Sequence, residues 1–303
     1  MYRKHLILAC LLMGFALPKM SAQEKISEEN KAKLIQLEDS LARYADSLGK
    51  AFIPMERLDF CITFTGFLKE ALNIPGSAYY PFSKLTGKVH ILYPEDKSFR
   101  IFNWLVAPSP NVRRYYGVIQ LIQQDPQYYP LIDYSEELVK EAETTIQSAN
   151  QWFGGELYRI LTRTDDQGIK RYFLFGFNTH GLYSNKKILD VLSFSPKGPI
   201  LGAPIFIVPD DRGKKLVEQT RLILEYKKSA QASLNYDEDK KMIVFNRLGS
   251  EINDYRRKST YIPTGQTDGL RWDGQKWVFV KEAIPVLRLH DGQAPIDGVM
   301  GGN

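Results

Sequence analysis

A period-two alternation of apolar and polar side chains, beginning at Gly87, constrains this chain more than any other feature. Val89 to Tyr93 and Phe99 to Val106 flank the turn sequence Pro94-Glu95-Asp96-Lys97, which is typical of a β-hairpin. Similar short runs continue to Val280. Because no helical crossover segments separate most of them, the pattern predicts an antiparallel meander. A sandwich, a barrel and a small propeller all remain compatible with it.

The expected strands share this alternation and are bounded by turn residues. They cover residues 89–93, 99–106, 115–122, 128–133, 157–163, 171–178, 188–194, 204–208, 222–227, 232–236, 242–248, 270–272 and 276–280. One longer segment, Ser135 to Trp152, interrupts the series. We predict a helix there, with Ser135 as its N-cap and Gly154-Gly155 after its end.

Two helices are predicted before the β-rich part. Ser27 can cap the first, which runs to Leu48 and is stopped by Gly49. Its leucines recur at steps of three and four and give one apolar stripe. A coiled-coil seam is one reading of this stripe, but its shortness favours a helix docked on its own domain. Met55 to Leu72 is apolar almost all round, so we expect a buried second helix that forms a hairpin with the first.

These patterns together predict an α+β fold, in which an N-terminal helical hairpin is followed by a large antiparallel β-meander. We expect a signal peptide over residues 1–23 and a helical region over 24–76. A β-rich domain with one inserted helix should cover 77–284, and a flexible C-terminal tail should cover 285–303. The length is sufficient for a sizeable core, in one large domain or two small ones.

The first residues have the composition of a secretory signal. Arg3 and Lys4 precede the apolar run Leu6 to Leu17, and the small residues Ser21-Ala22 follow it. This run is too short for a transmembrane helix, which needs about 20 residues. Cys10 loosely resembles a lipobox cysteine, but it lies inside the apolar run rather than after it. We therefore expect an exported protein, periplasmic or extracellular, and favour this over a lipoprotein or a buried N-terminal helix.

Charge and cysteine content narrow the class of protein further. Three of the 40 basic residues lie in the predicted signal, which leaves 37 basic against 35 acidic residues. This near balance gives no support for nucleic-acid binding, which needs a basic face. Cys61 is then the only cysteine that remains, so the core must be held by packing rather than by an internal disulfide. In its apolar setting Cys61 is expected to be a small buried hydrophobe.

A search for catalytic chemistry finds no complete motif. The sequence lacks a nucleophile elbow, a His-Glu-x-x-His pair, a Cys-x-x-Cys pair, a P-loop and a full EF-hand loop. Asp237-Glu238-Asp239 begins like a calcium loop but lacks its glycine and distant glutamate, so we interpret it as a hairpin turn. Outside the signal, His90, His180 and His290 are not at ligand spacing. We predict no metal and no cofactor.

Five residues are candidates for a binding site. Arg100 and Trp104 share one face of an expected strand, and Asp190 lies on an otherwise apolar face of another. A buried charge needs a partner, so Arg100 and Asp190 either pair for the fold, with one another or elsewhere, or line a pocket with Trp104. Tyr116 belongs to one of several tyrosine pairs that can place a ring outside the core. His180 is expected at a loop tip.

Several signatures together resemble an uncharacterised family of exported Bacteroidota proteins. They are Tyr80-Pro81-Phe82, Phe99 to Trp104, Tyr116 to Gln120, Asn185 to Phe194, Gly202 to Phe206, Tyr236 to Glu238, Met242 to Phe245 and Gly274 to Val278. The resemblance extends from about Met55 to Val280 and implies location and fold, without an activity. Asn246 and Thr264 stand where the resemblance leads us to expect aspartate, which weakens any ion site there.

The function expected from these observations is non-catalytic. We predict a binding or structural protein of the cell envelope whose partner is an envelope protein or a glycan. The alternative is a hydrolase of envelope or dietary polymers, with Asp133 or Asp190 as acid or base. That chemistry needs two carboxylates about 5 to 10 Å apart in a cleft, a relationship that sequence spacing does not reveal.

Overall fold

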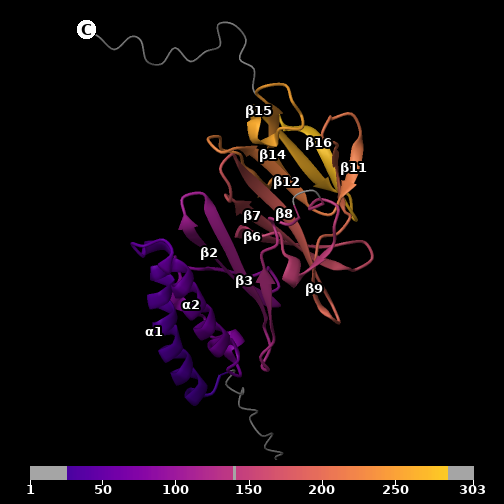
Figure 1. Cartoon of the computed structure of the whole chain (residues 1–303). Helices are drawn as coiled ribbons and strands as arrows, with labels where there is room; N and C mark the ends of the chain where they lie inside the picture. Colours follow the sequence, from indigo (N-terminus) through magenta and orange to yellow (C-terminus); the bar gives the residue numbers. More distant parts are fainter. Residues whose placement is uncertain (1–25, 139–140, 286–303) are drawn as a thin grey trace, which may run out of the picture.

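The computed structural model of the protein describes residues 26–138 and 141–285, so the predicted signal peptide and residues 286–303 of the predicted tail lie outside the described residues. Within these ranges a helical hairpin and three β-sheets are stacked as four layers (Figure 1). The predicted fold class is confirmed, and none of the sheets in the described ranges closes into a barrel. No helix in these ranges is long and apolar enough to span a membrane.

The first layer is the hairpin of α1 (Glu28–Lys50) and α2 (Glu56–Leu72). Ser27 caps α1 as predicted, since its Oγ accepts a hydrogen bond of 3.2 Å from a backbone N–H in the first turn. The apolar sides of both helices pack together and onto the first sheet. The expectation that the second helix is buried all round is wrong, because Ile62 on its outer side is 72% exposed.

The second layer is an antiparallel sheet in the order β1-β2-β3-β4. Its strands are β1 (His90–Leu92), β2 (Phe99–Ser109), β3 (Val112–Leu121) and β4 (Tyr128–Ile132). Because successive side chains point to opposite faces, β2 directs Trp104 toward the helices and Ile101 toward the next sheet. Both faces of β2 are therefore buried.

The third layer is an antiparallel sheet in the order β5-β9-β8-β7-β6, with β12 also paired to β8. Its strands are β5 (Gln147–Ser148), β6 (Glu156–Thr164), β7 (Lys170–Asn178), β8 (Ser184–Ser195), β9 (Gly198–Leu201) and β12 (Leu222–Lys227). Phe173 faces the fourth layer and Leu174 the second. Cover on both faces explains why β7 is an almost continuous apolar run.

The fourth layer has the strand order β11-β10-β16-β15-β14-β13. Its strands are β10 (Phe206–Pro209), β11 (Leu216–Gln219), β13 (Leu234–Asp237), β14 (Met242–Ser250), β15 (Tyr261–Trp272) and β16 (Trp277–Ile284). Neighbouring strands are antiparallel except for the pair β10 and β16, which is parallel. The short strands β5, β9 and β11 are not expected from the sequence pattern, because two to four residues are too few for a clear alternation.

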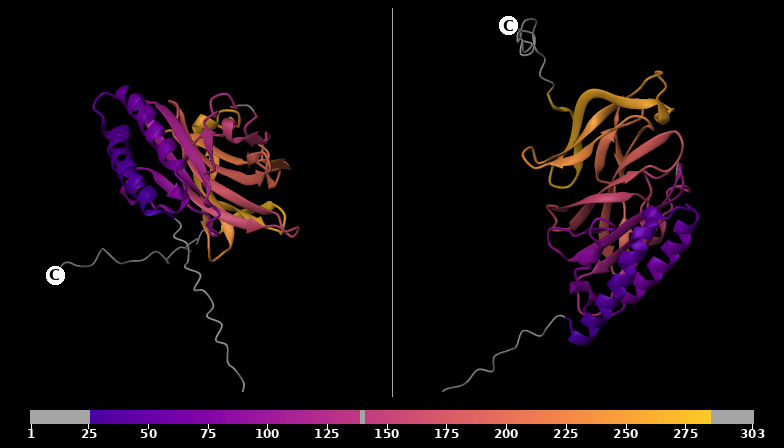
Figure 2. Two further views of the ribbon diagram at one scale, coloured as in Figure 1. Left: turned by 90° about the horizontal axis from the view of Figure 1, so that it is seen from below. Right: turned by 90° about the vertical axis from the view of Figure 1, so that its left-hand side faces the viewer.

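Each interface between layers has its own hydrophobic core. One core lies between the helices and the first sheet, the next between the first and second sheets, and the last between the second and third sheets. Figure 2 shows the same stack from two other directions, with the helices at one end and the strands β14 to β16 at the other. Short 3-10 helices connect the elements: η1 (Ser77–Tyr79), η2 (Ser83–Leu85), η3 (Ala149–Gln151) and η4 (Lys258–Thr260).

The helix predicted over residues 135–152, inserted in the β-rich domain, is not formed. The described residues of this segment have turns, the two-residue strand β5 and the 3-10 helix η3. Distant partners satisfy its backbone instead: the Trp152 N–H donates to the Ile132 carbonyl at 3.0 Å, and the Glu143 carbonyl accepts from Thr220 at 2.7 Å. Tertiary hydrogen bonds have replaced the helical ones, so the local pattern was misleading.

Candidate functional site

The helices leave part of the first sheet uncovered, and a groove lies there between α2 and β4. In the register of β3 and β4, Tyr116 is opposite Ile132 and Val118 is opposite Pro130, so these side chains share the helix-facing side. Both helices pack on β2, whereas Ile132 on the edge strand is 53% exposed. The groove has a volume of about 620 Å³, within the usual range for ligand pockets.

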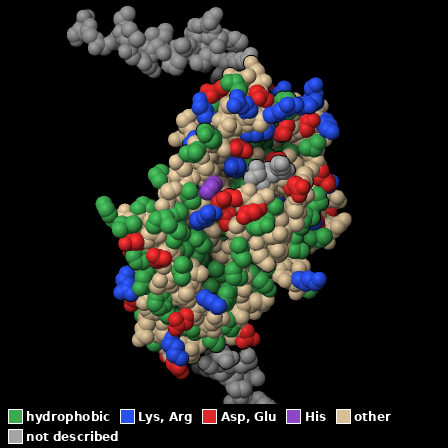
Figure 3. Space-filling view, in the orientation of Figure 1, with side chains coloured by type: hydrophobic (Ala, Val, Ile, Leu, Met, Phe, Trp, Pro, Cys, Tyr) green, Lys and Arg blue, Asp and Glu red, His purple; other side chains and the backbone are tan. Residues whose placement is uncertain are grey.

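We call this feature the α2–β4 groove. It is lined from the helix by Thr65, Leu68, Lys69 and Leu72, and from the sheet by Trp104, Arg114, Tyr115, Tyr116, Gly117, Val118, Tyr128, Pro130, Leu131, Ile132 and Asp133. Most of these side chains are apolar or aromatic. On the face seen in Figure 3, hydrophobic side chains gather over the helical layer and the first sheet, while charged side chains are denser at the opposite end of the molecule.

Two of the predicted site residues form the floor of the groove. The rings of Trp104 and Tyr116 are stacked, with centroids 5.7 Å apart and planes inclined by 8°. Phe64 of α2 meets the Trp104 ring edge-on at 5.1 Å, and Trp104 Nε1 donates to Cys61 Sγ at 3.3 Å. Each ring is fixed by its neighbours, so the floor is a preorganised aromatic surface.

Burial controls the protonation of the groove floor. It raises the pKa of Tyr116 to about 12, with a further contribution from nearby Cys61. Burial likewise raises the pKa of the Cys61 thiol. Cys61 is 2% exposed, which confirms the predicted buried position. Both groups are neutral at pH 7, so the floor offers no thiolate nucleophile.

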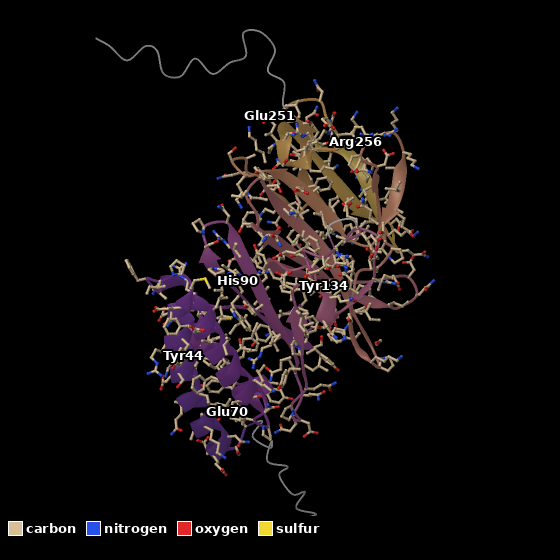
Figure 4. All side chains as sticks on the ribbon, viewed as in Figure 1. Tyr44, Glu70, His90, Tyr134, Glu251 and Arg256 are labelled. Carbon is tan, nitrogen blue, oxygen red and sulfur yellow. The ribbon has the colours of Figure 1, made fainter. Side chains whose placement is uncertain are left out.

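Among the residues that the structure describes, Asp133 is the only carboxylate that lines the groove. Its Oδ1 accepts hydrogen bonds from the backbone N–H groups of Ser135 at 3.0 Å and Gly154 at 3.1 Å. A Cβ on Gly154 would lie 2.2 Å from Asp133 Cγ, so glycine is required for this approach. Figure 4 labels the next residue, Tyr134, near the middle of the molecule. Through these hydrogen bonds Asp133 fixes the position of the chain after β4, so its role is structural.

Arg100, a third predicted site residue, lies outside the groove and is fully buried on β2. Its guanidinium donates to Gln120 Oε1 at 2.9 Å, to the carbonyls of Tyr80 at 2.6 Å and Ser77 at 2.8 Å, and to Tyr93 Oη at 3.1 Å. Burial lowers the pKa of Arg100 from its ordinary value. The hypothesis that Arg100 pairs with Asp190 is wrong, because backbone carbonyls of the η1 region hold this charge.

Asp190 pairs instead with Arg221, a residue that the sequence did not single out. Arg221 Nε lies 3.1 Å from Asp190 Oδ2, and both side chains are almost fully buried. Arg221 also donates to Gln147 Oε1 at 2.9 Å and to the carbonyls of Thr145 and Ala142. The pair therefore fastens residues 142–147 to the second sheet. Asp190 has no access to the groove and serves the fold.

His180, the remaining predicted site residue, lies in the turn after β7 and is half-buried rather than fully exposed. Its Nδ1 lies 3.1 Å from the backbone nitrogen and 3.0 Å from the carbonyl oxygen of Arg113, and its Nε2 lies 3.6 Å from Glu136 Oε1. Glu136 also pairs with Arg114, whose side chain lines the groove. His180 is thus connected to the groove rim through Glu136, but it does not line the groove.

A second cavity, lined by both charged and apolar side chains, contains a carboxyl group that the sequence did not indicate. Glu143 borders a cleft of about 540 Å³ and a smaller cavity of about 130 Å³, both of which Glu225 and Lys258 also line. Burial raises the pKa of Glu143 to about 7, and the carboxylate of Asp211 adds to this effect. We call this feature the Glu143 cleft. No sequence pattern indicated this cleft, because Glu143 lies inside the segment that we predicted as a helix.

Within residues 26–138 and 141–285, no cluster of three or more His, Cys, Asp or Glu side chains could hold a metal ion. Asn246, which stands where the resemblance suggests aspartate, accepts hydrogen bonds through its Oδ1 from the N–H and hydroxyl of Ser233 at 2.7 and 2.8 Å. Thr264 donates to the Arg247 carbonyl at 3.3 Å. Both residues act as hydrogen-bonding parts of the third sheet.

Comparisons with protein families, with curated proteins and with solved structures find no match to this chain. The resemblance to exported Bacteroidota proteins therefore stays a prediction. Of the five predicted binding residues, the structure brings Trp104 and Tyr116 together and places Arg100, Asp190 and His180 elsewhere. The wall residues Leu68 and Pro130 were missed. Strand alternation hints at Pro130, but only the packing of α2 shows that it faces a groove.

Proposed function

We propose that the protein is a non-catalytic binding component of the cell envelope and that it takes up the apolar part of a ligand in the α2–β4 groove. The observation that supports this most is an uncovered apolar groove of about 620 Å³ with a preorganised aromatic floor. Pockets of this size and composition are typical of ligand sites. Apolar surface left open on a folded protein also marks interaction sites.

The groove favours an amphipathic ligand over a neutral glycan. A sugar needs an open ring face on which to stack, whereas Trp104 is 4% exposed and its face is covered by Tyr116. Lys69 and Arg114 place two cations in the groove lining against the carboxylate of Asp133, although Arg114 also pairs with Glu136. An acyl chain, or an apolar peptide side chain with an anionic group nearby, matches this combination of apolar walls and cations.

The test is binding of the amphipathic anionic dye 1-anilinonaphthalene-8-sulfonate, measured by titration calorimetry. Thr65→Trp places a bulky side chain in the groove from the exposed surface of α2 and should weaken binding about tenfold or more. Glu70→Trp is the matched control, since Glu70 is exposed on the same helix and does not line the groove. Equal affinity of both variants and the parent protein would reject the groove as the site.

The Glu143 cleft supports a second candidate function, that of a carboxylate-dependent hydrolase. A carboxyl group with a pKa near 7 can act as a general acid, and Glu225 and Asp211 supply further carboxylates in the same cleft. Neither Asp133 nor Asp190 fits this role, because Asp133 accepts structural hydrogen bonds and Asp190 is buried in its ion pair with Arg221. Hydrolysis of peptidoglycan or neutral glycans that is lost in Glu143→Gln would support this candidate, whereas a parent protein inactive on both would remove it.

Export of the chain is also proposed, on the basis of its first 23 residues. The protein recovered from the envelope or the medium should begin near Gln23 and carry no lipid on Cys10. Intact-mass measurement tests this directly. A full-length cytosolic form, or a diacylglycerol-modified cysteine, would contradict it.

A further inference from the structure

Three turns, one from each of the first three layers, lie side by side. The guanidinium of Arg57 donates through Nε and Nη2 to the Ala51 carbonyl, at 3.1 and 3.0 Å, and through Nη1 to the Ala107 carbonyl at 3.1 Å. This holds the turn between α1 and α2 against the end of β2. The N–H of Gly181 donates to the Asn111 carbonyl at 2.9 Å, which holds the turn between β7 and β8 against the turn between β2 and β3.

Large apolar side chains project from two of these turns. Phe52 is 97% exposed, Ile53 49% and Met55 62% in the first turn, while Leu182 is 57% and Tyr183 73% exposed in the last. Five of the 14 exposed large hydrophobic residues of the described chain are therefore in two short segments. In Figure 3, hydrophobic side chains protrude at the left edge, where Figure 1 shows the α1–α2 turn. Such clustering on turns marks an interaction surface.

Basic side chains accompany this apolar cluster. Lys228 Nζ donates to the Thr179 carbonyl at 2.5 Å, beside the β7–β8 turn. Burial lowers the pKa of Lys228, and the nearby charges of Arg113 and Lys186 lower it further. Within the described residues, neither Arg113 nor Lys228 forms an ion pair with a carboxylate. The cations repel one another and would gain from an anionic partner.

We propose that these turns, with Phe52, Met55, Leu182, Tyr183, Arg113 and Lys228 as their principal side chains, dock on the surface of an anionic lipid membrane. Apolar side chains on protruding turns can enter the headgroup region, where tyrosine is also favoured. Basic residues beside them are attracted electrostatically to anionic headgroups. The inference is independent of the proposed ligand, although docking would bring the Arg114 end of the α2–β4 groove close to the bilayer.

A second copy of the chain fits this surface less well. A symmetric dimer formed through the turns would bring the same patch of each copy together. The Arg113 and Lys228 charges of one subunit would then approach those of its partner, with a repulsive contribution. A membrane with anionic lipids presents the complementary charge instead, and its soft surface accommodates turns that do not form a flat face.

Vesicle sedimentation of the whole protein tests the proposal. We expect binding to vesicles of phosphatidylcholine mixed with phosphatidylglycerol, weak binding to phosphatidylcholine alone, and loss of binding at high salt. The double variant Phe52→Ser with Leu182→Ser should lower the vesicle partition coefficient about tenfold or more. Leu216→Ser is the matched control, because Leu216 is 52% exposed on β11, in the fourth layer.

Three results would overturn the proposal. The first is that the protein binds neither type of vesicle, and the second is that it binds vesicles with and without phosphatidylglycerol equally well. The third is that the variant Phe52→Ser with Leu182→Ser binds as well as the parent protein. Light scattering measures the oligomeric state and so tests the competing occupant. If the parent protein is a dimer and the double variant is a monomer, the surface binds a second copy of the chain. Matching circular dichroism and melting temperatures verify folding, since both replaced side chains are solvent-exposed.

Discussion

Asp190 and Arg221 form an ion pair in the interior of the protein, with Arg221 Nε 3.1 Å from Asp190 Oδ2. Asp190 is on β8 and Arg221 immediately precedes β12, its partner strand. The remaining donors of Arg221 reach residues 142–147. A single buried pair thus joins β8 and the start of β12 to the irregular segment before β5 and to β5 itself.

Removal of one partner of this pair should be strongly destabilising. Asp190→Asn and Arg221→Met should each lower the free energy of unfolding by about 3 to 5 kcal/mol, because each leaves a buried charge without its counter-charge. The double variant should lose clearly less than the sum. Denaturant unfolding measures the cycle. Asp190→Asn combined with Arg100→Met is the control and should be additive within about 0.5 kcal/mol; coupling there instead would contradict the assignment.

Cys61 should be inert to thiol reagents in the folded protein and reactive after denaturation. Its side chain is buried, and burial raises the pKa of its thiol, so little thiolate is available. Cys61→Ser should lower the free energy of unfolding by about 1 to 3 kcal/mol, because a hydroxyl replaces an apolar group. Labelling with a maleimide, followed by mass spectrometry, checks the first expectation. Rapid modification of the native protein would mean that the region under Trp104 opens.

Glu143 should make stability depend on pH. Burial raises its pKa from 4.5 to about 7 in the folded state. The contribution of the neutral carboxyl group to the free energy of unfolding is therefore complete below about pH 4.5 and is lost as the pH rises through about 7. The contribution is about 1 to 3 kcal/mol, because Glu143 is half-buried and partly screened. Glu143→Gln should remove this slope from unfolding curves, while Glu137→Gln, at an exposed position, should retain it. An unchanged slope in Glu143→Gln would place the titration elsewhere.

Gly154→Ala should destabilise the protein although it adds only one methyl group. The new Cβ would lie 2.2 Å from Asp133 Cγ, so the carboxylate must move and lose hydrogen bonds at the end of β4. We expect a loss of about 1 to 3 kcal/mol. Gly66→Ala is the control, because the helical Gly66 has nothing within 4 Å of a new Cβ and should gain about 1 kcal/mol. Thermal unfolding of both variants distinguishes local strain from a general effect of replacing glycine.

The aromatic floor of the groove could be predicted in part from the sequence. The period of two placed Trp104 and Arg100 on one face, and the tyrosine pairs indicated that Tyr116 could lie outside the core. Both inferences depend only on the alternation of side chains along a strand. The depth of the groove depends on how much of the first sheet α2 covers. This packing is a long-range contact, so the local sequence pattern does not reveal it.

By itself, the sequence determined what neighbouring residues decide: the Ser27 cap, the helical hairpin, the antiparallel strands and the burial of Cys61. Local hydrogen bonds and side-chain periodicity act over a few residues, so they can be read along the chain. Only the tertiary structure decided that Asp190 pairs with Arg221 and that residues 135–152 form no helix. In that segment the backbone carbonyls of Ala142 and Thr145 bind a distant guanidinium, and such long-range contacts override local preference because they satisfy a buried charge.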